Sequence, residues 1–392
     1  MQQDYDVVVI GAGIHGAGVA QAVAAAGYSV LVLEQYDGAA KGSSSRSSKL
    51  IHGGLRYLES GQLHLVRECL HERAVLLRIA PHLVKLVPFH IPVYRDTRRR
   101  PWKIILGLII YTLFSRKRFH MVSRRTWNQL DGLRTDRLDA VLSYYDAQTD
   151  DAHLTRSVLA SARELGADVM TCAEFTRARL GPDEVEVSYV RNADRQTISA
   201  RVLINAAGPW VNLVLASVYR SSGQEVDKLD AELVQGSHIV VPGDLSHPYY
   251  LEAPQDGRAV FVVPWKNNIL VGTTESHYQG DPASVKPLSA EIEYLLEVYN
   301  HYFRQDLGRE QVIDAFAGLR VLPGGQGEAF NKSRDTHFLA DDASHPRLVS
   351  IYGGKLTSYR AVADKLLAMI SKTLPVRTPL ADTRTLKLPL ID

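Results

Sequence analysis

Three glycines near the start of the chain have the spacing of a phosphate-binding turn. Gly11, Gly13 and Gly16 follow the β-branched run 6–10 and open an Ala/Val-rich segment that ends at Gly27. In a strand–turn–helix unit the first glycine permits the turn, the second lets the backbone approach a pyrophosphate, and the third lets the helix pack on the strand. Amides at the helix N-terminus attract the negative charge. The pattern therefore predicts that a dinucleotide binds at this turn.

An acidic residue follows the next predicted strand. The run 29–33 has the composition of a buried strand, and Glu34 comes directly after it. A carboxylate in that position binds the ribose of an adenine dinucleotide and repels the 2′-phosphate of NADP. A turn that only packs a helix on a sheet would not need the acid there. This first unit therefore indicates FAD or NAD and does not by itself distinguish them.

A second glycine turn lies near the other end of the chain. The predicted strand 348–352 runs into Gly353 and Gly354, and an apolar helix follows. A reduced flavin carries negative charge near N1 and O2, which amides at the start of that helix would stabilise, with Lys355 or Thr357 beside them. This favours FAD over NAD. The alternative is a turn that simply packs its helix on the sheet.

The polar loop after the second strand carries the most distinctive string of the chain. Residues 44–58 read Ser-Ser-Arg-Ser-Ser-Lys-Leu-Ile-His-Gly-Gly-Leu-Arg-Tyr-Leu. This string resembles that of the FAD-dependent, quinone-linked glycerol-3-phosphate dehydrogenases, which belong to the D-amino-acid-oxidase-like flavoproteins. The likeness recurs, in order, at 205–210, 236–242, 272–274, 318–320 and 353–360. It therefore covers nearly the whole chain.

The resemblance implies an α/β fold in which a Rossmann-like FAD-binding domain carries an inserted antiparallel-sheet substrate domain. The expected FAD-binding segments are 1–88, 146–225 and 308–392. The expected substrate-binding and membrane-facing segments are 89–145 and 226–307. Strands predicted at 236–241, 258–264 and 268–272 would form the antiparallel sheet.

Three residues and the length depart from the family pattern. Ala22 and Ala26 stand where family members often have an acid and an arginine, and Glu275 follows Gly-Thr-Thr where they usually have Asp. Family members commonly carry a further C-terminal helical domain. The chain is therefore expected to be a short form without that domain.

The resemblance also implies roles for individual side chains. His238 is the candidate base that takes the hydroxyl proton of the substrate, with Lys355 on the polar side of the flavin, because a histidine titrates near neutral pH. The alternative for His238 is a hydrogen bond that only orients the substrate, and the alternative for Arg320, the third expected catalytic residue, is a structural ion pair. The residues expected to recognise substrate phosphate or hydroxyl groups are Arg56, Tyr57, Arg320 and Arg334.

The residues expected to contact the cofactor come from all of these segments. They are Gly11, Gly13, Ile14, His15, Gly16, Glu34, Ser44, Ser45, Ser48, Lys49, Leu50, Gly53, Gly54, Ala207, Gly208, Trp210, Gly354, Lys355, Leu356 and Thr357.

These expectations define the leading hypothesis for the activity. The chain would oxidise sn-glycerol 3-phosphate to dihydroxyacetone phosphate, transfer a hydride to flavin N5 and pass the electrons to a quinone. A second hypothesis is an FAD-dependent oxidase of an amine or a 2-hydroxy acid that uses O2. A third is a flavin-binding membrane protein without turnover.

A basic, apolar stretch points to a membrane surface. Residues 95–125 contain ten lysines and arginines with Asp96 as the one acid, and they bracket the apolar run 104–114. A helix needs about 20 apolar residues to cross a bilayer, so this run is too short. Flanking cations with Trp102 and Tyr111 near the ends are typical of an interfacial helix on anionic lipid. The alternative is a buried helix of the substrate domain with a solvated basic rim.

Composition narrows the remaining classes. The net charge of +2 and the lack of aromatic residues between the clustered cations argue against nucleic acid binding. The two cysteines, Cys69 and Cys172, lie far apart, so no metal site or disulfide framework is expected. A strand starts almost at the N-terminus, without a signal-peptide pattern before it. The expected location is cytoplasmic, peripheral on the inner face of the cell membrane.

Overall fold

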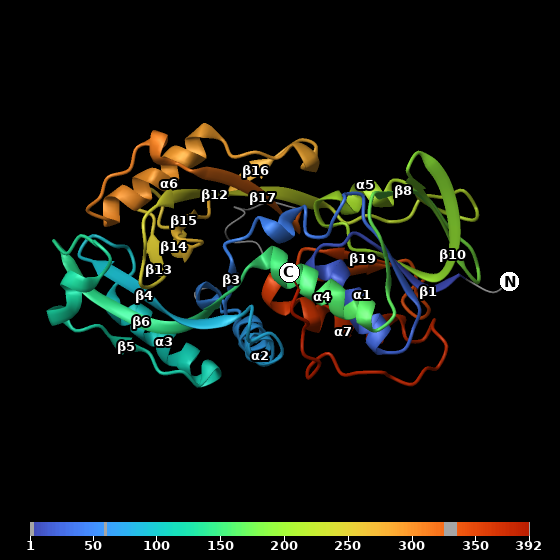
Figure 1. The fold of residues 1–392 in the computed structure, drawn as a ribbon, viewed down its shortest axis with the longest axis horizontal. Helices are drawn as coiled ribbons and strands as arrows, with labels where there is room; N and C mark the ends of the chain where they lie inside the picture. The colour runs from blue at the N-terminus through green and yellow to red at the C-terminus, as the bar shows by residue number, and fades with distance from the viewer. Residues whose placement is uncertain (1–3, 59–60, 325–334, 392) are drawn as a thin grey trace.

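The structure is a computed structural model that describes residues 4–58, 61–324 and 335–391. It contains two sheets, one on the side of the N-terminus in Figure 1 and one on the opposite side, around β4 (Lys85–Tyr94), β6 (Leu138–Gln148) and β13 (Tyr249–Glu252). One predicted site residue, Arg334, lies outside the described residues.

The centre of the first sheet is parallel, in the strand order β7-β2-β1-β10-β19. Strands β1, β2 and β19 are largely apolar and buried, as expected of strands that are covered on both faces. Beyond β10 the sheet continues through β9, β8 and β11, and β18 pairs antiparallel with β19. The bounds are β1 Tyr5–Ile10, β2 Val30–Leu33, β7 Asp168–Met170, β8 Ala173–Leu180, β9 Val185–Arg191, β10 Asp194–Asn205, β11 Val218–Arg220, β18 His337–Ala340 and β19 Leu348–Tyr352.

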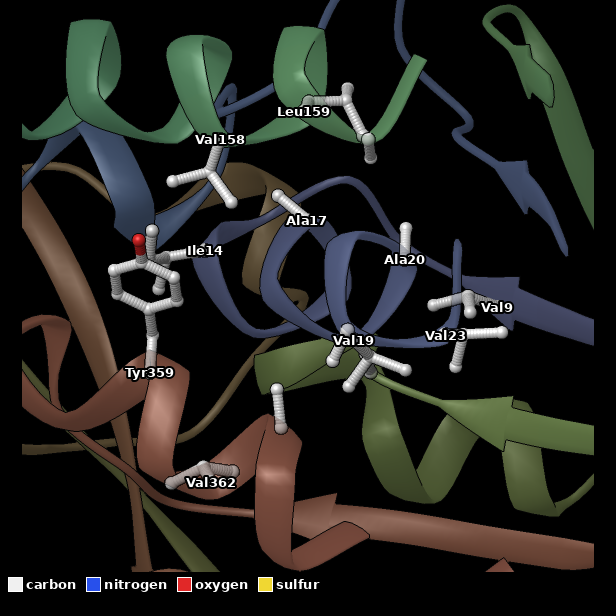
Figure 2. Close-up of a cluster of buried hydrophobic side chains, with 14 of the residues drawn as sticks. Val9, Ile14, Ala17, Val19, Ala20, Val23, Val158, Leu159, Tyr359 and Val362 are labelled. Carbon is white, nitrogen blue, oxygen red and sulfur yellow. The ribbon is translucent and has the colours of Figure 1, made fainter. Parts of the chain in front are cut away.

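Three helices pack together on one face of this sheet: α1 (Ile14–Ala25), α4 (Asp151–Glu164) and α7 (Tyr359–Ile370). Figure 2 shows Ala17 and Ala20 of α1 among side chains of α4 and α7. A Cβ on Gly18 would lie 2.6 Å from the Tyr359 ring, so α7 approaches α1 where the side chain is missing. The small residues of α1 therefore allow close helix packing below the glycine turn.

The second sheet is mainly antiparallel, in the order β16-β12-β15-β14-β13-β4-β6-β3, with β17 beside β12 and β5 beside β6. The exception is a parallel contact between β13 and β4. The bounds are β3 Leu50–Ile51, β4 Lys85–Tyr94, β5 His120–Met121, β6 Leu138–Gln148, β12 Ala231–Pro242, β13 Tyr249–Glu252, β14 Ala259–Trp265, β15 Asn268–Gly272, β16 Ser276–Tyr278 and β17 Asp314–Pro323.

The remaining helices cover the second sheet or join the two sheets. α6 (Ser289–Tyr302) packs on β12, β14 and β15, while α2 (Leu63–Ile79) contacts both α3 (Pro101–Ser115) and the 3₁₀ turn 356–358 before α7. The short α5 (Val211–Leu215) lies near β8, β10 and β19. Among the described residues, no helix is both long and apolar enough to span a bilayer.

The α/β fold with a second, antiparallel sheet is confirmed. The pairing of strands bears on the predicted domain boundaries but does not test them. The segment 308–392 was assigned to the FAD-binding part, and within it β17 pairs with β12 over ten residue pairs in the second sheet. Strand pairing alone does not define a domain, so the division stays a prediction.

Candidate active site

A cavity of about 720 Å³ lies where β1, β2 and β10 of the first sheet end and the second sheet begins. Its wall includes the last residues of β1 and β2, the loop 41–48, the segment 206–210 and the turn 353–357. In open α/β sheets, ligands bind outside the carboxyl ends of parallel strands. The cavity is therefore at the position that the fold provides for a cofactor.

The glycine turn after β1 has the close approaches that its sequence predicts. Gly11 has φ +97°, and a Cβ there would lie 2.9 Å from the carbonyl oxygen of Ala206. A Cβ on Gly16 would lie 1.8 Å from the Gly11 carbonyl oxygen, so this residue packs the helix against the turn. Gly13 lines the cavity, and Ser44 Oγ accepts a hydrogen bond of 2.9 Å from the Ile14 amide.

Glu34 is buried at the end of β2, beside the same turn. Its Oε2 accepts a hydrogen bond of 2.7 Å from the Ala12 amide, and its Oε1 accepts one of 3.0 Å from the Tyr36 amide. Burial raises the pKa of the Glu34 carboxyl, and these backbone amides oppose the increase. The side chain is thus held at the cavity wall by the backbone of both neighbouring loops.

His238 lies on β12 and is 2% exposed. Its Nε2 lies 2.9 Å from Ser48 Oγ, and its ring stacks on Phe316 at 5.0 Å between centroids. The contact with β15 is close, because a Cβ on Gly272 would lie 2.1 Å from the His238 ring. Burial, followed by the charges of Arg320 and Lys49, lowers the pKa of His238 well below its usual value.

Arg320 and Lys355 approach the cavity from different segments of the chain. Arg320, on β17, donates a hydrogen bond of 3.1 Å from Nη2 to Thr273 Oγ1, and its Nη1 lies 3.8 Å from Glu275 Oε1. Lys355 follows the glycine turn after β19, and its Nζ lies 4.5 Å from the centre of the Tyr57 ring. Both cations line the cavity together with His238. The predicted catalytic residues, from three distant segments, are thus brought together.

A smaller cavity of about 70 Å³ adjoins the first one. The residues that line both cavities are His52, Tyr57, Phe261 and Thr273. Arg56, predicted to bind substrate, lines the smaller cavity and not the larger one.

Comparison with known proteins places this geometry in a family. Residues 6–360 match the profile of the family described as FAD dependent oxidoreductase. The chain belongs to this family of FAD-dependent oxidoreductases. The FAD cofactor and the enzyme class expected from the sequence are therefore confirmed.

Two relatives and one solved structure indicate the branch of these FAD-dependent oxidoreductases. The glycerol-3-phosphate dehydrogenase of Pseudomonas aeruginosa is 39% identical over 399 residues, which cover 98% of this chain and 75% of that protein. The D-erythritol 1-phosphate dehydrogenase of Brucella abortus is 36% identical over 388 residues, which cover 94% and 74%. The crystal structure of the Bacillus halodurans glycerol-3-phosphate dehydrogenase complexed with FAD has a TM-score of 0.77 and 26% identity, over 99% of this chain and 68% of that chain. The expected resemblance is confirmed.

The residues of the large cavity fit FAD. The turn leaves no space for a side chain at Gly11, the Ile14 amide stands at the start of α1, and Glu34 lies beside them, which together suit a pyrophosphate and an adenine ribose. Gly354 and Lys355 line the same cavity, and Gly354 packs against His15 at the start of α1. These residues would hold the isoalloxazine end.

Most predicted cofactor residues line the large cavity, and five do not. Lys49 is buried, with its Nζ 2.7 Å from Asp151 Oδ1 and 2.6 Å from the Ser45 carbonyl oxygen, so it ties the loop to α4. Gly54 lines the smaller cavity instead. The five outside the large cavity are Gly16, Ser45, Lys49, Gly53 and Gly54. Contact with FAD stays a prediction for all of the residues expected to bind the cofactor.

Some cavity-lining residues were not predicted. Thr273 belongs to the Gly-Thr-Thr string 272–274, so that string contained a signal for it. Arg46 likewise belongs to the distinctive string 44–58. Phe175 carries no such signal, because it reaches the cavity only through the way β8 folds beside it. Among the described residues, no cluster of histidine, cysteine and acidic side chains could hold a metal ion.

Proposed function

We propose that this FAD-dependent oxidoreductase oxidises the secondary alcohol of sn-glycerol 3-phosphate to dihydroxyacetone phosphate. The observation that carries the proposal is that His238 and the cations Arg320 and Lys355 line the same cavity. Oxidation of a phosphorylated alcohol needs a base for the hydroxyl proton and positive charge for the phosphate. The names of the two relatives, both dehydrogenases of polyol phosphates, support the same chemistry.

His238 acts as the base in this proposal. Because burial and the nearby cations lower its pKa, the ring is neutral at pH 7, and Nε2 can accept a proton in the tautomer that carries its hydrogen on Nδ1. The Ser48 hydroxyl contacts the same nitrogen at 2.9 Å and holds the ring in place. A phosphate dianion beside the ring would raise its pKa toward neutrality, so substrate binding itself makes His238 a stronger base.

The cations recognise and orient the substrate. The Arg320 guanidinium donates a hydrogen bond of 3.1 Å to Thr273 Oγ1, and a planar guanidinium can bind a phosphate through two hydrogen bonds. The Tyr57 ring lies next to the Lys355 ammonium group, and Tyr57 lines both cavities. The two side chains are therefore suited to position the carbinol carbon of the substrate where the two cavities meet. Arg56 contributes from the smaller cavity, and the role of Arg334 stays a prediction. FAD, when bound, supplies the hydride acceptor.

The experiment that tests this proposal measures product and acceptor together. Purified FAD-loaded protein is given sn-glycerol 3-phosphate with a short-chain quinone or with O2 alone. We expect stoichiometric dihydroxyacetone phosphate and fast turnover with the quinone. Peroxide release at an equal rate without quinone would favour an oxidase, and oxidation of an amine or a 2-hydroxy acid in place of the phosphate ester would overturn the proposal.

We also propose that α3 docks on the cytoplasmic face of the cell membrane, where a quinone is available. Apolar side chains at helical spacing, Trp102, Leu106, Ile109 and Leu113, are 62%, 53%, 46% and 73% exposed. Leu108 and Tyr111 of the same helix are buried on the protein side. Exposed cations lie in the first turn of the helix, at Lys103, and just beyond its C-terminal end, at 116–118. Apolar burial combined with attraction to anionic lipid is what a peripheral helix needs.

A further inference from the structure

His15 connects the two glycine turns of the FAD cavity. It lies in the first turn of α1 and lines that cavity. A Cβ on Gly354 would lie 2.1 Å from His15 Nε2 and 2.6 Å from its Cε1, so one edge of the ring packs directly on the backbone of the turn after β19. Because Gly354 and Lys355 would hold the isoalloxazine end of FAD, His15 lies beside the part of the wall that is expected to face that end.

The two ring nitrogens of His15 have different surroundings. Nδ1 is buried, and among the described residues it has no hydrogen-bond partner. With its hydrogen on Nδ1, the neutral ring would bury an N–H group without an acceptor, which is rare in proteins. The neutral ring is therefore expected to carry its hydrogen on Nε2, the nitrogen beside Gly354.

The ring carries no charge at neutral pH. Burial lowers the pKa of His15 from 6.5 to about 4, and among the described residues no charged side chain contributes to that decrease. The elements around the start of α1 bring several ionisable side chains to the cavity or its floor, namely Glu34, Lys41, Arg46, Asp151, Lys355 and Tyr359. At pH 7 His15 thus offers a hydrogen-bond donor and no formal charge.

A donor at this place would distinguish the two oxidation states of the flavin. A reduced flavin carries negative charge near N1 and O2. Hydrogen bonds to a charged acceptor are roughly twice as strong as those between neutral groups. A donor that is already fixed in position therefore stabilises the reduced flavin more than the oxidised one.

We propose that His15 is a neutral hydrogen-bond donor, through Nε2–H, to the isoalloxazine end of FAD, and that it raises the midpoint potential of the flavin by stabilising the reduced form. The inference goes beyond the proposed function, because it concerns the FAD cavity and holds for whichever substrate reduces the cofactor. His15 is a positioning and electrostatic residue in this account and takes no proton from the substrate.

The first measurement is the midpoint potential of the FAD-loaded protein, titrated with a reductant and a reference dye. No substrate is present, so failure of the proposed function would leave the result unchanged. His15→Leu removes the donor and should lower the potential by about 30 mV, which is a tenfold change in the equilibrium of two-electron reduction. His15→Gln keeps an amide N–H near the place of Nε2 and should restore most of the difference. An unchanged potential in His15→Leu, or equal potentials in the two variants, would overturn the proposal.

His90→Leu is the matched control. His90 is also a histidine whose pKa burial lowers to about 4, but it lines neither cavity. Its replacement should leave the potential of the flavin unchanged. The lower potential of His15→Leu should also be the same at pH 6, 7 and 8, because a neutral donor takes up no proton when the flavin is reduced. A difference from wild type that grows as the pH falls would show that His15 is protonated on reduction, and would overturn its assignment as a neutral donor.

The second measurement is made on the wild-type protein and does not depend on FAD retention by a variant. Nitrogen-15 NMR of protein with ring-labelled histidines reports which nitrogen of each ring carries hydrogen, and comparison with His15→Gln assigns the His15 signals. We expect hydrogen on Nε2 in both the oxidised and the reduced protein. Hydrogen on Nδ1, or on both nitrogens in the reduced protein, would contradict the proposal.

Discussion

Arg320 is expected to bind the substrate phosphate through the planar shape of its guanidinium as well as through its charge. Its guanidinium is held by Thr273 on one side and lies near Glu275 on the other. Arg320→Lys keeps the charge and loses the planar fork, so we expect kcat/KM for sn-glycerol 3-phosphate to fall at least tenfold, which is about 1.4 kcal/mol. Stopped-flow flavin reduction measures the effect.

Arg347→Lys is the matched control for that substitution. Arg347 donates hydrogen bonds to the carbonyl oxygens of Asp183 and Arg201 and does not line the cavity. Flavin content should be normal in both variants. If Arg320→Lys and Arg347→Lys had equal activity, Arg320 would have only a structural role.

The glycine turn after β1 is expected to determine whether the protein retains FAD. Gly13 lines the FAD cavity, and a Cβ there would lie 3.1 Å from Ser44 Oγ. Gly13→Leu adds a side chain where the pyrophosphate has to approach the backbone, so we expect a folded protein that purifies colourless. Absorbance near the visible flavin band and circular dichroism test this together. A yellow Gly13→Leu protein would show that the pyrophosphate binds elsewhere.

Burial of His90 is expected to make the stability of the protein depend on pH. Burial, followed by the charge of His247, lowers the pKa of His90 from 6.5 to about 4, with Asp131 opposing and His120 adding to the effect. As pH falls below about 6.5, the unfolded chain binds a proton that the folded protein excludes, so stability decreases. The loss should level off once the pH falls below the folded pKa of about 4, where His90 is protonated in both states.

The variant His90→Gln isolates this contribution. Between pH 7 and pH 5, wild type should lose on the order of 1–2 kcal/mol more stability than the variant. Denaturant unfolding at equal flavin loading measures the difference. If the free energy of unfolding differed between wild type and His90→Gln by the same amount at pH 7 and at pH 5, His90 would not contribute to the pH dependence of stability.

Individual residues also show where sequence reasoning stops. The glycine turn and Glu34 are predictable because the spacing of a single βαβ unit constrains them. The contact of Lys49 could not be predicted in this way. Its partner Asp151 lies 102 residues away, and no local sequence pattern indicates that the two residues meet. The same holds for Ser48 and His238, which are 190 residues apart.

Among the helices and strands, α3 shows most clearly which features the sequence could predict and which it could not. The sequence predicted an apolar run at 104–114, and the helix extends from Pro101 to Ser115, with Pro101 in its first turn and Arg116 in a left-handed conformation at its C-cap. The apolar run could be read from the sequence, but which face is buried could not. That face is fixed by Tyr111, whose hydroxyl donates to Asp146 in the distant strand β6.

Membrane association should depend on the cations around α3. Reversing Arg116, Arg118 and Arg125, all exposed, to Glu should release the protein from anionic vesicles in a flotation assay, because each cation contributes roughly 1 kcal/mol near the surface. Wild-type binding should weaken as salt is raised. The control reverses Arg163, Arg191 and Arg195, which are exposed and distant in sequence. Vesicle binding that survives the first set of reversals would exclude α3 as the docking surface.

At the scale of the whole molecule, the site exists only because two sheets meet. The FAD turn and Glu34 come from the first sheet, and His238 and Arg320 come from β12 and β17 of the second. The class of fold was predictable from the order of strand, turn and helix signals. The pairing of β12 with β17 was not, because strands more than seventy residues apart in sequence carry no local signal of their partner.

The most direct test of the account is a single anaerobic experiment on the FAD-loaded wild-type protein. Equal concentrations of sn-glycerol 3-phosphate, glycerol, a neutral amino acid and a 2-hydroxy acid are mixed with it separately, and loss of the oxidised flavin band is followed in time. We expect rapid bleaching by the phosphate ester and at least hundredfold slower bleaching by glycerol, since the clustered cations would lack their partner. Bleaching by glycerol, the amino acid or the hydroxy acid as fast as by the phosphate ester would contradict the account.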